Sequence, residues 1–400
     1  MGIKVGVVGC GSFSKSFIRL FQAHPYVEKV VLCDLDESKL KERGAETGIT
    51  DFSPSLDRLL ETDVDAVALF TQNWLHGPQA KKALKKGKHV YSAVPMGITF
   101  EEIKDIVEAV EKTGNIYMMG ETSYYYPDVI YCRNRFLEGA FGDTVYTECE
   151  YYHDWDHGSY DVMKRRGGAN WKQTAGSPPM HYCTHSVSCF VSVTNAYLTK
   201  VSCFGFVDKN RDGYDLYGEG KNLWNNSFSN ESALFYASDG SIVRVNEFRR
   251  IGYPGAVRVS MYGTEGSFEN RSSEGSKKGC VWLTKNREET VCLDDLLECA
   301  PRYLTDDPAV IRDEKPVNFA KIQPTDQLPD SLKKINSGHF MSHNFLIHEF
   351  VHACYYKTMP KNNAWMAARY TIPGIIAHES AVKFGQMLTI PDLGCPKEYR

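Results

Sequence analysis

The sequence predicts an α/β domain with a doubly wound parallel sheet, followed by an α+β domain with an open, mainly antiparallel sheet. Three observations lead to this fold class. A strand, a glycine-rich turn and an amphipathic helix open the chain of 400 residues. Strand-like and helix-like stretches then alternate up to residue 120, and strand-like stretches follow one another after residue 144. We place the two domains at residues 1–122 and 123–400.

The glycine-rich turn gives the first indication of a ligand. After the apolar run of residues 3–8, the chain has Gly9, Gly11 and Ser14 in the spacing G-x-G-x-x-S, and then a helix-like stretch. Gly9 permits a tight turn, Gly11 lets the backbone approach a diphosphate, and Ser14 allows close packing of helix on strand. This is the pattern of a Rossmann dinucleotide site. Its candidate contact residues are Gly9, Gly11, Ser12, Phe13 and Ser14.

The second strand ends at Asp34, roughly 20 residues beyond the glycine turn. A carboxylate at this distance can bind both hydroxyls of a ribose, and it would repel a 2′-phosphate. The alternative interpretation is a surface aspartate that merely follows a strand. Because the glycine pattern precedes it, we expect Asp34 to bind NAD in preference to NADP.

The first domain continues as alternating elements. Strands are expected at 65–70, 88–93 and 115–120, and helices at 78–87 and 100–114. Ligand contacts in such sheets come from the segments that follow the strands. The candidates in these segments are Thr71, Asn73, Trp74, His76, Ala93, Val94, Glu121 and Thr122.

The second domain reads as a mixture of helices and a sheet. Helices are expected at 129–139 and 343–356, and strands at 144–155, 199–207, 231–237, 241–248, 256–263 and 280–284. Residues 156–177 read as a polar aromatic loop, and 285–338 as an irregular excursion over the surface.

Composition excludes several classes of function. The net charge is −4 with a pI near 6.3, so no basic surplus indicates nucleic acid as a partner. No apolar run approaches the roughly 20 residues of a membrane-spanning helix, and we expect no membrane association and no secretory signal. The 12 cysteines form no C-x-x-C pair, so they predict buried thiols in a cytoplasmic protein.

The stretch HYCTH, residues 181–185, concentrates polar side chains. Helix spacing would place His181 and His185 on one face. Three interpretations arise: a metal site, a thiol nucleophile at Cys183, or a sugar-facing acid/base cluster. No H-E-x-x-H pattern supports a metal, and a packed thiol explains Cys183. The candidates for a third metal ligand are His153, His157, His339 and His343.

The glycine turn, Asp34, TQNWLH (71–76), AVP (93–95) and GTEG (263–266) occur in an order that resembles the Gfo/Idh/MocA oxidoreductase family over nearly the whole chain. Two motifs depart from the family pattern. The usual E-K-P reads AVP, so the lysine is missing, and the usual D-x-G-x-H reads HYCTH. Tyr182–His185 is similar to the Y-P-T-H motif of the NAD-dependent glycoside hydrolases of this family, with cysteine for proline. Residues 363–381 also look like this branch and its relatives that act on 3-keto sugars.

The resemblance implies bound NAD, a carbohydrate substrate and a homo-oligomer, dimer or tetramer, formed through the open face of the second sheet. It implies Tyr182 as the base, with His185 either hydrogen-bonding the oxidised hydroxyl or serving as a second acid/base group. Neighbouring imidazole or a positive nicotinamide would favour the phenolate of Tyr182. The substrate-binding residues that we expect are His181, Thr184, Lys172, Tyr253 and Tyr125, and we expect no metal ligand.

Three functions stay open. The first is a glycosidase that oxidises a sugar hydroxyl, at C3 by expectation, eliminates the C1 group, adds water and returns the hydride. The second is a sugar 3-dehydrogenase that releases NADH. The third is a sugar or nucleotide sensor without turnover, which the missing family lysine favours. Some relatives that eliminate from sugars use a divalent cation, so a metal is a further alternative.

Overall fold

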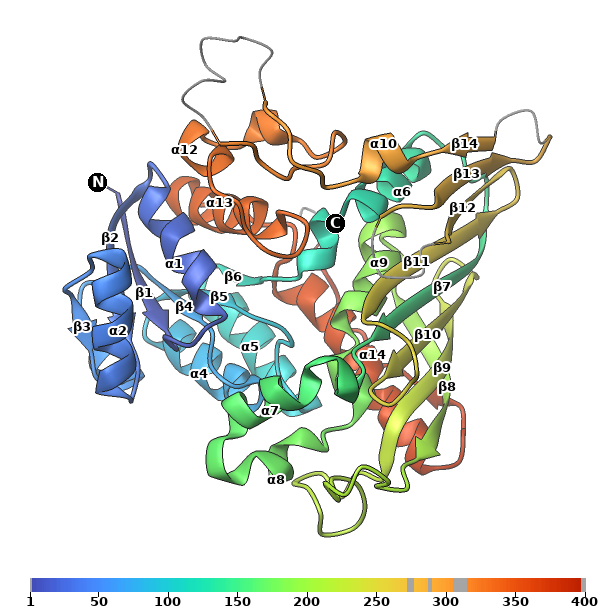
Figure 1. The fold of residues 1–400 in the computed structure, drawn as a ribbon, viewed down its shortest axis with the longest axis horizontal. Coiled ribbons are helices and arrows are strands. Elements are labelled where there is room, and N and C mark those ends of the chain that lie inside the picture. The colour runs from blue at the N-terminus through green and yellow to red at the C-terminus, as the bar shows by residue number, and fades with distance from the viewer. Residues whose placement is uncertain (1, 272–276, 287–289, 305–314, 397–400) are drawn as a thin grey trace. The chain divides into compact units, whose positions relative to one another are not determined.

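The computed structural model describes residues 2–271, 277–286, 290–304 and 315–396. The chain forms two compact units (Figure 1). Unit 1 contains residues 1–126, 299–368 and 393–400, and unit 2 contains 127–298 and 369–392. The predicted boundary between residues 122 and 123 gives two domains that are each continuous in sequence, whereas each of these units combines separate segments of the chain. The position of the boundary between the two domains therefore stays a prediction.

Unit 1 is built on a six-stranded sheet in the order β3-β2-β1-β4-β5-β6, in which every pair is parallel. This is the Rossmann strand order, and it confirms the predicted fold class. The elements are β1 (Ile3–Val8), α1 (Ser14–Ala23), β2 (Val27–Cys33), α2 (Glu37–Thr47), β3 (Phe52–Ser53), α3 (Leu56–Leu60), β4 (Ala66–Leu69), α4 (Asn73–Lys85), β5 (His89–Ser92), α5 (Phe100–Thr113), β6 (Tyr117–Met119), the 3-10 helix η1 (Thr122–Tyr125), η5 (Thr325–Gln327), α12 (Asp330–Lys333) and α13 (Ser342–Tyr356).

Most elements of unit 1 begin where the sequence places them, but α4 starts five residues before the predicted 78. The predicted range makes Pro78 the first helical residue, a position at which proline is common. It lies instead in the second turn, and the segment after β4 is itself helical from Asn73. The expected contact residues Asn73, Trp74 and His76 therefore belong to the first turn of α4.

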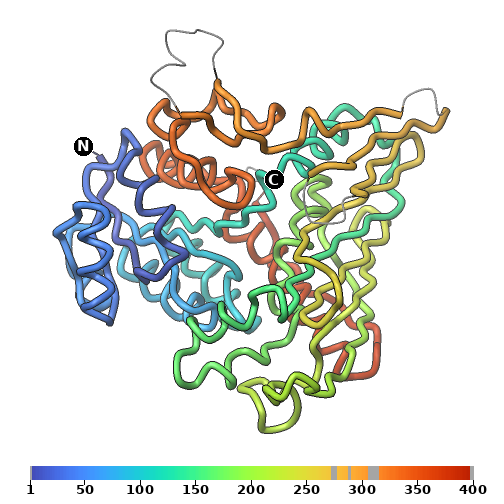
Figure 2. Tube along the Cα trace, in the orientation of Figure 1, coloured from blue at the N-terminus to red at the C-terminus, as the bar shows by residue number. Residues whose placement is uncertain are grey.

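Helix α13 belongs to the core of unit 1, although it follows residue 340 in sequence. Its buried Leu346, Ile347 and Phe350 share one apolar cluster with Phe17 and Phe21 of α1. Figure 2 shows this orange segment beside the blue start of the chain. The packing brings residues near 340 to the glycine-rich turn that precedes α1.

Unit 2 is built on a mixed sheet in the order β14-β13-β12-β11-β7-β10-β9-β8-β15. Only β7 and β10 pair in parallel among these strands. The elements are α6 (Pro127–Leu137), β7 (Thr144–Tyr152), η2 (Trp155–His157), α7 (Ser159–Gly167), η3 (Gly168–Asn170), α8 (Trp171–Ala175), η4 (Pro179–Tyr182), α9 (Thr184–Thr194), β8 (Leu198–Val207), β9 (Phe228–Ala237), β10 (Ile242–Phe248), β11 (Ala256–Gly263), β12 (Gly266–Asn270), β13 (Cys280–Thr284), β14 (Thr290–Cys292), α10 (Asp294–Leu297), β15 (Leu388–Thr389) and the end of α14 (Ala364–Val382).

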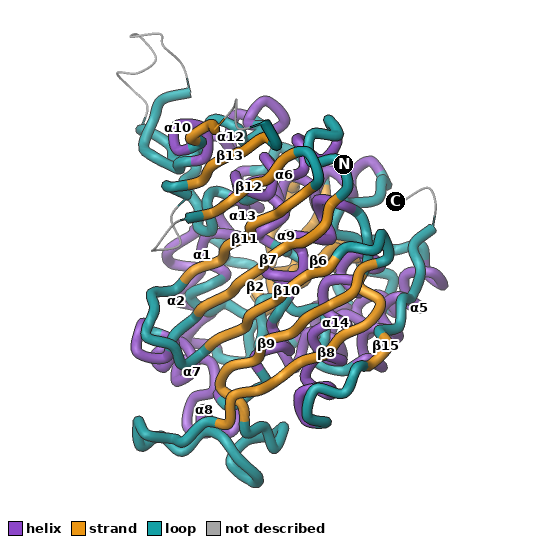
Figure 3. Tube along the Cα trace, turned by 90° about the vertical axis from the view of Figure 1, so that its right-hand side faces the viewer, coloured by secondary structure: helices purple, strands orange, loops and turns teal. Residues whose placement is uncertain are grey.

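The two faces of this sheet differ. Alternate residues of each strand point to opposite faces. On β9, Ala233 and Phe235 are buried, whereas Leu234 and Tyr236 are each 51% exposed. Figure 3 shows the exposed side of the strands toward the viewer, with no helix in front of them. The predicted open, mainly antiparallel sheet is confirmed.

Two expectations about irregular segments need correction. Residues 156–177, predicted as a loop, form α7, η3 and α8. Their aromatic side chains pack among themselves, with Trp155 and Tyr160 stacked at 4.8 Å, so no regular apolar face marks these helices in the sequence. The expected excursion at 285–338 contains β14, α10, η5 and α12, while its residues 287–289 and 305–314 lie outside the described part.

Within the residues that the structure describes, no helix is long and apolar enough to cross a membrane.

Candidate active site

The glycine-rich turn has the geometry that a dinucleotide requires. Gly9 has φ +93°, and a Cβ there would lie 2.8 Å from the carbonyl oxygen of Phe70. A Cβ on Gly11 would meet open space, so a ligand can approach this backbone closely. Ser14 is buried at the start of α1, as predicted, and its hydroxyl donates to the carbonyl of Gly11 at 2.9 Å.

Asp34 stands at the end of β2 beside this turn. Its Oδ2 accepts the backbone N–H of Cys10 at 2.8 Å, and its Oδ1 accepts that of Asp36 at 2.9 Å. Ser12 and Phe13 are exposed and Asp34 is half-buried. A carboxylate held in this way can still receive hydroxyl groups of a ribose. The turn and the carboxylate together fit NAD.

One basic side chain beside this turn, Arg43, is already held by other groups. Arg43 is buried, donates to the carbonyl of Cys10 at 3.3 Å and is ion-paired with Glu46. A 2′-phosphate needs a cation that can reach it. The pairing of Arg43 therefore supports the expected preference for NAD.

The segments after β4 and β5 are tied together by His76. This side chain is buried, with Nδ1 at 2.8 Å from the carbonyl of Pro95 and Nε2 at 3.1 Å from that of Thr71. Both ring nitrogens thus face backbone groups. Half-buried residues in the same segments are Thr71, Asn73, Trp74, Ala93 and Val94.

Hydrogen bonds among its own residues and with α13 fix the segment after β6. Glu121 is buried and caps η1, accepting the N–H of Ser123 at 3.0 Å. Thr122 is buried with its hydroxyl 3.2 Å from that of Tyr126. Tyr125 donates to Glu349 of α13 at 2.8 Å and stacks on Phe345. The cofactor role of Glu121 and Thr122 and the substrate role of Tyr125 stay predictions.

In unit 2, the HYCTH stretch divides in two. His181 lies in η4 and His185 in α9, because the chain leaves the 3-10 geometry at Cys183. The imidazole of His181 lies 5.2 Å from that of His378, whereas that of His185 faces Tyr151 and Tyr182. The expectation of a single helix face for both histidines is therefore wrong.

Tyr182 and His185 do lie together, as the resemblance implies. Their ring centroids are 5.5 Å apart, and Tyr151 of β7 completes a triangle at 5.9 Å from Tyr182 and 5.4 Å from His185. The hydroxyl of Tyr151 lies 3.0 Å from Nδ1 of His153. Burial and the nearby Arg249 lower the pKa of His153 to about 4, so this ring is neutral, and its tautomer decides which of the two groups donates the hydrogen bond.

A buried charge pair supports this triangle. Glu247 of β10 accepts the hydroxyl of Ser186 at 2.6 Å and a guanidinium N–H of Arg249 at 3.1 Å. Arg249 also lies 5.0 Å from the ring centroid of Tyr151 and donates to the carbonyl of Pro179 at 3.4 Å. Burial raises the pKa of Glu247 to about 7, although Arg249 and Ser186 favour its charged form.

His181 belongs to a second buried group. Glu231 accepts the backbone N–H of Met180 at 2.8 Å and Nδ1–H of His378 at 2.7 Å, which fixes η4 against β9 and α14. Burial lowers the pKa of His181 to about 3, so it is neutral. Its Nδ1 is buried and has no hydrogen-bond partner among the described residues.

The remaining candidate residues of unit 2 do not lie together at one place. Thr184 is buried, and Cys183 is a buried thiol 3.7 Å from the carbonyl of Tyr370. Lys172 is exposed on α8. Tyr253 contacts Tyr152 at 5.5 Å, and Tyr152 points to the sheet face opposite to Tyr151. The structure thus groups Tyr182, His185 and the unpredicted Tyr151, and it does not bring Tyr253 to them.

The described part of the chain contains no cluster of three or more histidine, cysteine or acidic side chains able to hold a metal ion. His339 and His343, considered as ligands for the HYCTH stretch, lie in unit 1. That the protein uses no metal stays a prediction.

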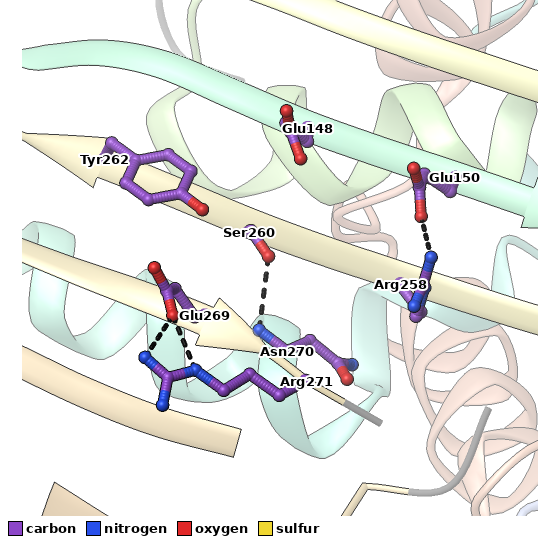
Figure 4. A pocket seen from close by; sticks show the side chains of 8 residues that line it. All are labelled: Glu148, Glu150, Arg258, Ser260, Tyr262, Glu269, Asn270 and Arg271. Atoms are coloured by element: carbon purple, nitrogen blue, oxygen red, sulfur yellow. Dashed lines mark hydrogen bonds and ion pairs between the residues drawn. The ribbon is translucent and has the colours of Figure 1, made fainter. Parts of the chain in front are cut away.

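A polar hollow of about 260 Å³ lies on the exposed sheet face, between β7, β11 and β12 (Figure 4). Glu150 is paired with Arg258, and Glu269 with Arg271. The third carboxylate of the lining, Glu148, is paired with Arg244 of β10, so each carboxylate of the hollow meets a cation and the charges balance.

Sequence reasoning missed Tyr151, Glu247 and Arg249, and it considered His153 only as a metal ligand. A signal existed for Glu247 alone. It follows Val243 and Val245 at the alternate positions that face the core, where an acidic side chain is rare unless paired. Tyr151 joins the site because helix α9 covers one face of strand β7. The sequence alone does not show which face the helix covers.

Comparison with known proteins shows which family part of this chain resembles. Residues 3–121 match the model of the Gfo/Idh/MocA family, described as an oxidoreductase family with an NAD-binding Rossmann fold. A glycosyl hydrolase family 109 protein of Shewanella amazonensis is 32% identical over 38% of this chain and 36% of its own length. The 2,7-anhydro-N-acetylneuraminate hydratase of Escherichia coli is 28% identical over 47% and 48%. The matched part thus spans between about a third and a half of these relatives.

Solved structures share the fold along nearly the whole chain. Levoglucosan dehydrogenase, solved with NADH and levoglucosan, superposes with a TM-score of 0.73 at 17% identity and covers 98% of this chain and 100% of its own. The myo-inositol 2-dehydrogenase of Lactobacillus plantarum has a TM-score of 0.68 at 15% identity, with the same coverage. These likenesses establish the fold. The family match and the glycine turn show that residues 3–121 resemble the NAD-binding Rossmann domain of the Gfo/Idh/MocA oxidoreductase family.

Proposed function

We propose that the protein is an NAD-dependent glycosidase that oxidises a sugar hydroxyl transiently, expels the group on C1, adds water and restores the hydroxyl. The observation that carries this proposal is the triangle of Tyr182, His185 and Tyr151 in unit 2. It offers two phenols and an imidazole at one place, which suits proton transfer to and from sugar hydroxyls.

The names of the relatives support redox-neutral chemistry. One is called a glycosyl hydrolase and another a hydratase. Both names describe the use of water without net oxidation. The Tyr182–His185 stretch also resembles the Y-P-T-H motif of the hydrolase branch.

Bound NAD supplies a hydride acceptor and, at the end of the cycle, a hydride donor. The residues of this chain supply the proton transfers. Tyr182 removes the proton of the sugar hydroxyl, and His185 hydrogen-bonds the same oxygen. Tyr151 stays neutral, because burial raises its pKa above the ordinary value. Its oxygen lies 3.0 Å from Nδ1 of His153, and a neutral phenol oxygen can also accept a hydrogen bond from a sugar hydroxyl.

The ketone formed on the sugar, at C3 in this proposal, acidifies the hydrogen on C2. Loss of that proton expels the C1 group as an alcohol once it receives a proton. Water then adds across the C1–C2 double bond, and the ketone is reduced back to the hydroxyl. This sequence needs no pair of catalytic carboxylates, unlike that of ordinary glycosidases.

The test uses the full chain with NAD, a panel of nitrophenyl α- and β-glycosides, and heavy water. The expected result is release of nitrophenol without net NADH, with deuterium incorporated at C2 of the sugar. Accumulation of NADH with no nitrophenol would assign the sugar dehydrogenase instead. Tight NAD binding with neither product across the panel would favour the sensor.

We also propose a homo-oligomer formed through the exposed face of the unit 2 sheet. Phe204 and Phe206 of β8 are 63% and 52% exposed on the same side as Leu234 and Tyr236. Contiguous apolar surface of this kind typically marks an interface. The balanced charges of the neighbouring hollow suit a second copy of the same face.

A further inference from the structure

The turn that precedes α13 has an unusual backbone. His339, Phe340 and Met341 have φ of +54°, +54° and +63°. Three consecutive residues other than glycine in the left-handed region are rare, because a Cβ is crowded there. Such conformations persist only where the surroundings impose them, and they gather at ligand sites.

His343 fixes this turn against α1. Its side chain is 2% exposed and packs against Phe17 in a tilted arrangement with ring centroids 4.1 Å apart. Its Nδ1 lies 3.3 Å from the hydroxyl of Ser16. Both partners belong to the first turn of α1, directly after the glycine-rich turn. The start of α13 is therefore held at the start of α1.

His339 is consequently placed at the dinucleotide turn. Its ring lies 6.1 Å from that of Phe13 in an edge-on arrangement, and 4.9 Å from that of His343. Phe13 is the residue immediately before α1, in the segment whose N–H groups would meet a diphosphate. His339 itself is exposed, so its imidazole is accessible to a ligand of this turn.

The glycine-rich turn contains no charged side chain of its own. Residues 9–14 read GCGSFS, and the following Lys15 is ion-paired with Glu46 at 2.9 Å. A diphosphate bound here would bring two negative charges to a neutral turn. An imidazole N–H beside that turn would complement them.

We infer that His339 is a cofactor-binding residue whose imidazole donates a hydrogen bond to the diphosphate of NAD, with His343 and Phe13 as the residues that position it. The inference rests on NAD as the cofactor and is independent of the sugar chemistry. Its test is a binding measurement, so its failure and that of the proposed glycosidase activity are distinguishable.

The experiment is calorimetric titration of cofactor-free full-length protein with NAD, ADP-ribose and AMP. NAD and ADP-ribose contain the diphosphate, and AMP does not. The variants are His339→Ala and His339→Gly. Glycine keeps the left-handed turn and removes only the imidazole. His352→Ala, in the third turn of α13, is the matched control.

For both His339 variants we expect about tenfold weaker binding of NAD and ADP-ribose, the effect of one hydrogen bond to a charged group. Binding of AMP should change less than twofold, and His352→Ala should behave as wild type. Melting curves of the cofactor-free variants establish that they are folded.

Three outcomes would overturn the inference. One is wild-type affinity for NAD in the glycine variant, because the turn and not the imidazole would then be responsible. Another is an equal loss for AMP, which would place the contact elsewhere on the nucleotide. The third is an equal loss of NAD affinity in His352→Ala.

Discussion

The carboxylate of Asp34 accepts a hydrogen bond at 2.8 Å from the backbone N–H of Cys10, the residue between the two glycines of the dinucleotide turn. One oxygen of this side chain therefore orders the turn, while the half-buried carboxylate remains available to a ribose. Cofactor selection and the shape of the turn depend on the same residue.

Asp34→Ala should weaken NAD binding by about tenfold or more, since hydrogen bonds between a carboxylate and the ribose hydroxyls are lost. Binding of NADP should fall less or improve, because repulsion of the 2′-phosphate disappears. Calorimetry with both nucleotides measures the ratio. Asp36→Ala is the control, because it removes only the N-cap of α2. A wild type that prefers NADP would contradict this reading of Asp34.

Tyr182→Phe should lower the rate of hydride transfer by about 10²-fold or more, the low end of general-base contributions. The ring remains, so the melting temperature and NAD affinity should barely change. Single-turnover formation of NADH with a competent sugar measures this step. Tyr262→Phe, on the exposed face of the unit 2 sheet, is the control. Wild-type turnover in the Tyr182 variant would remove this residue from the mechanism.

Glu247 should make the free energy of unfolding depend on pH. Burial raises its pKa to about 7 from an ordinary 4.5. The unfolded chain releases this proton first as the pH rises, so stability is lost between pH 4.5 and 7, by up to about 3 kcal/mol. Glu247→Gln should flatten this part of the curve in urea unfolding. Identical pH curves for the two proteins would show that Glu247 is charged throughout.

A chelator should leave turnover unchanged. The described residues offer no set of three ligands, and His181 and His185 face different partners. Incubation with EDTA followed by an activity assay is sufficient. Loss of activity that a divalent cation restores would assign a metal to this enzyme.

The parts of the site that could be predicted are those that local sequence encodes. Gly9, Gly11 and Asp34 lie within one strand–turn–helix–strand segment, where spacing alone fixes the geometry. Tyr182 and His185 were predicted from the resemblance to a four-residue motif, in which only Cys183 and Thr184 separate them. Such short-range patterns do not depend on how distant elements pack.

The parts that could not be predicted depend on long-range packing. Tyr151 joins the site because α9 covers one face of β7, and Glu247 because β10 pairs with β7 in parallel. His339 reaches the glycine turn only because α13 packs on α1. His181 and His185 face different partners because the helix changes from 3-10 to α geometry at Cys183. No glycine or proline marks this change at that position.

The exposed sheet face leads to the last prediction. Phe204 and Leu234 lie on adjacent strands of unit 2 and are 63% and 51% exposed. If two copies meet through this face, aspartate at both positions would bury unpaired charge in the interface, and association should fail. We expect a dimer or tetramer for the wild type and a monomer for the double variant, by light scattering at micromolar concentration. Leu137→Asp is the control, because this leucine is 77% exposed at the end of α6, on another element. A monomeric wild type, or a double variant that assembles as before, would show that the face serves another purpose.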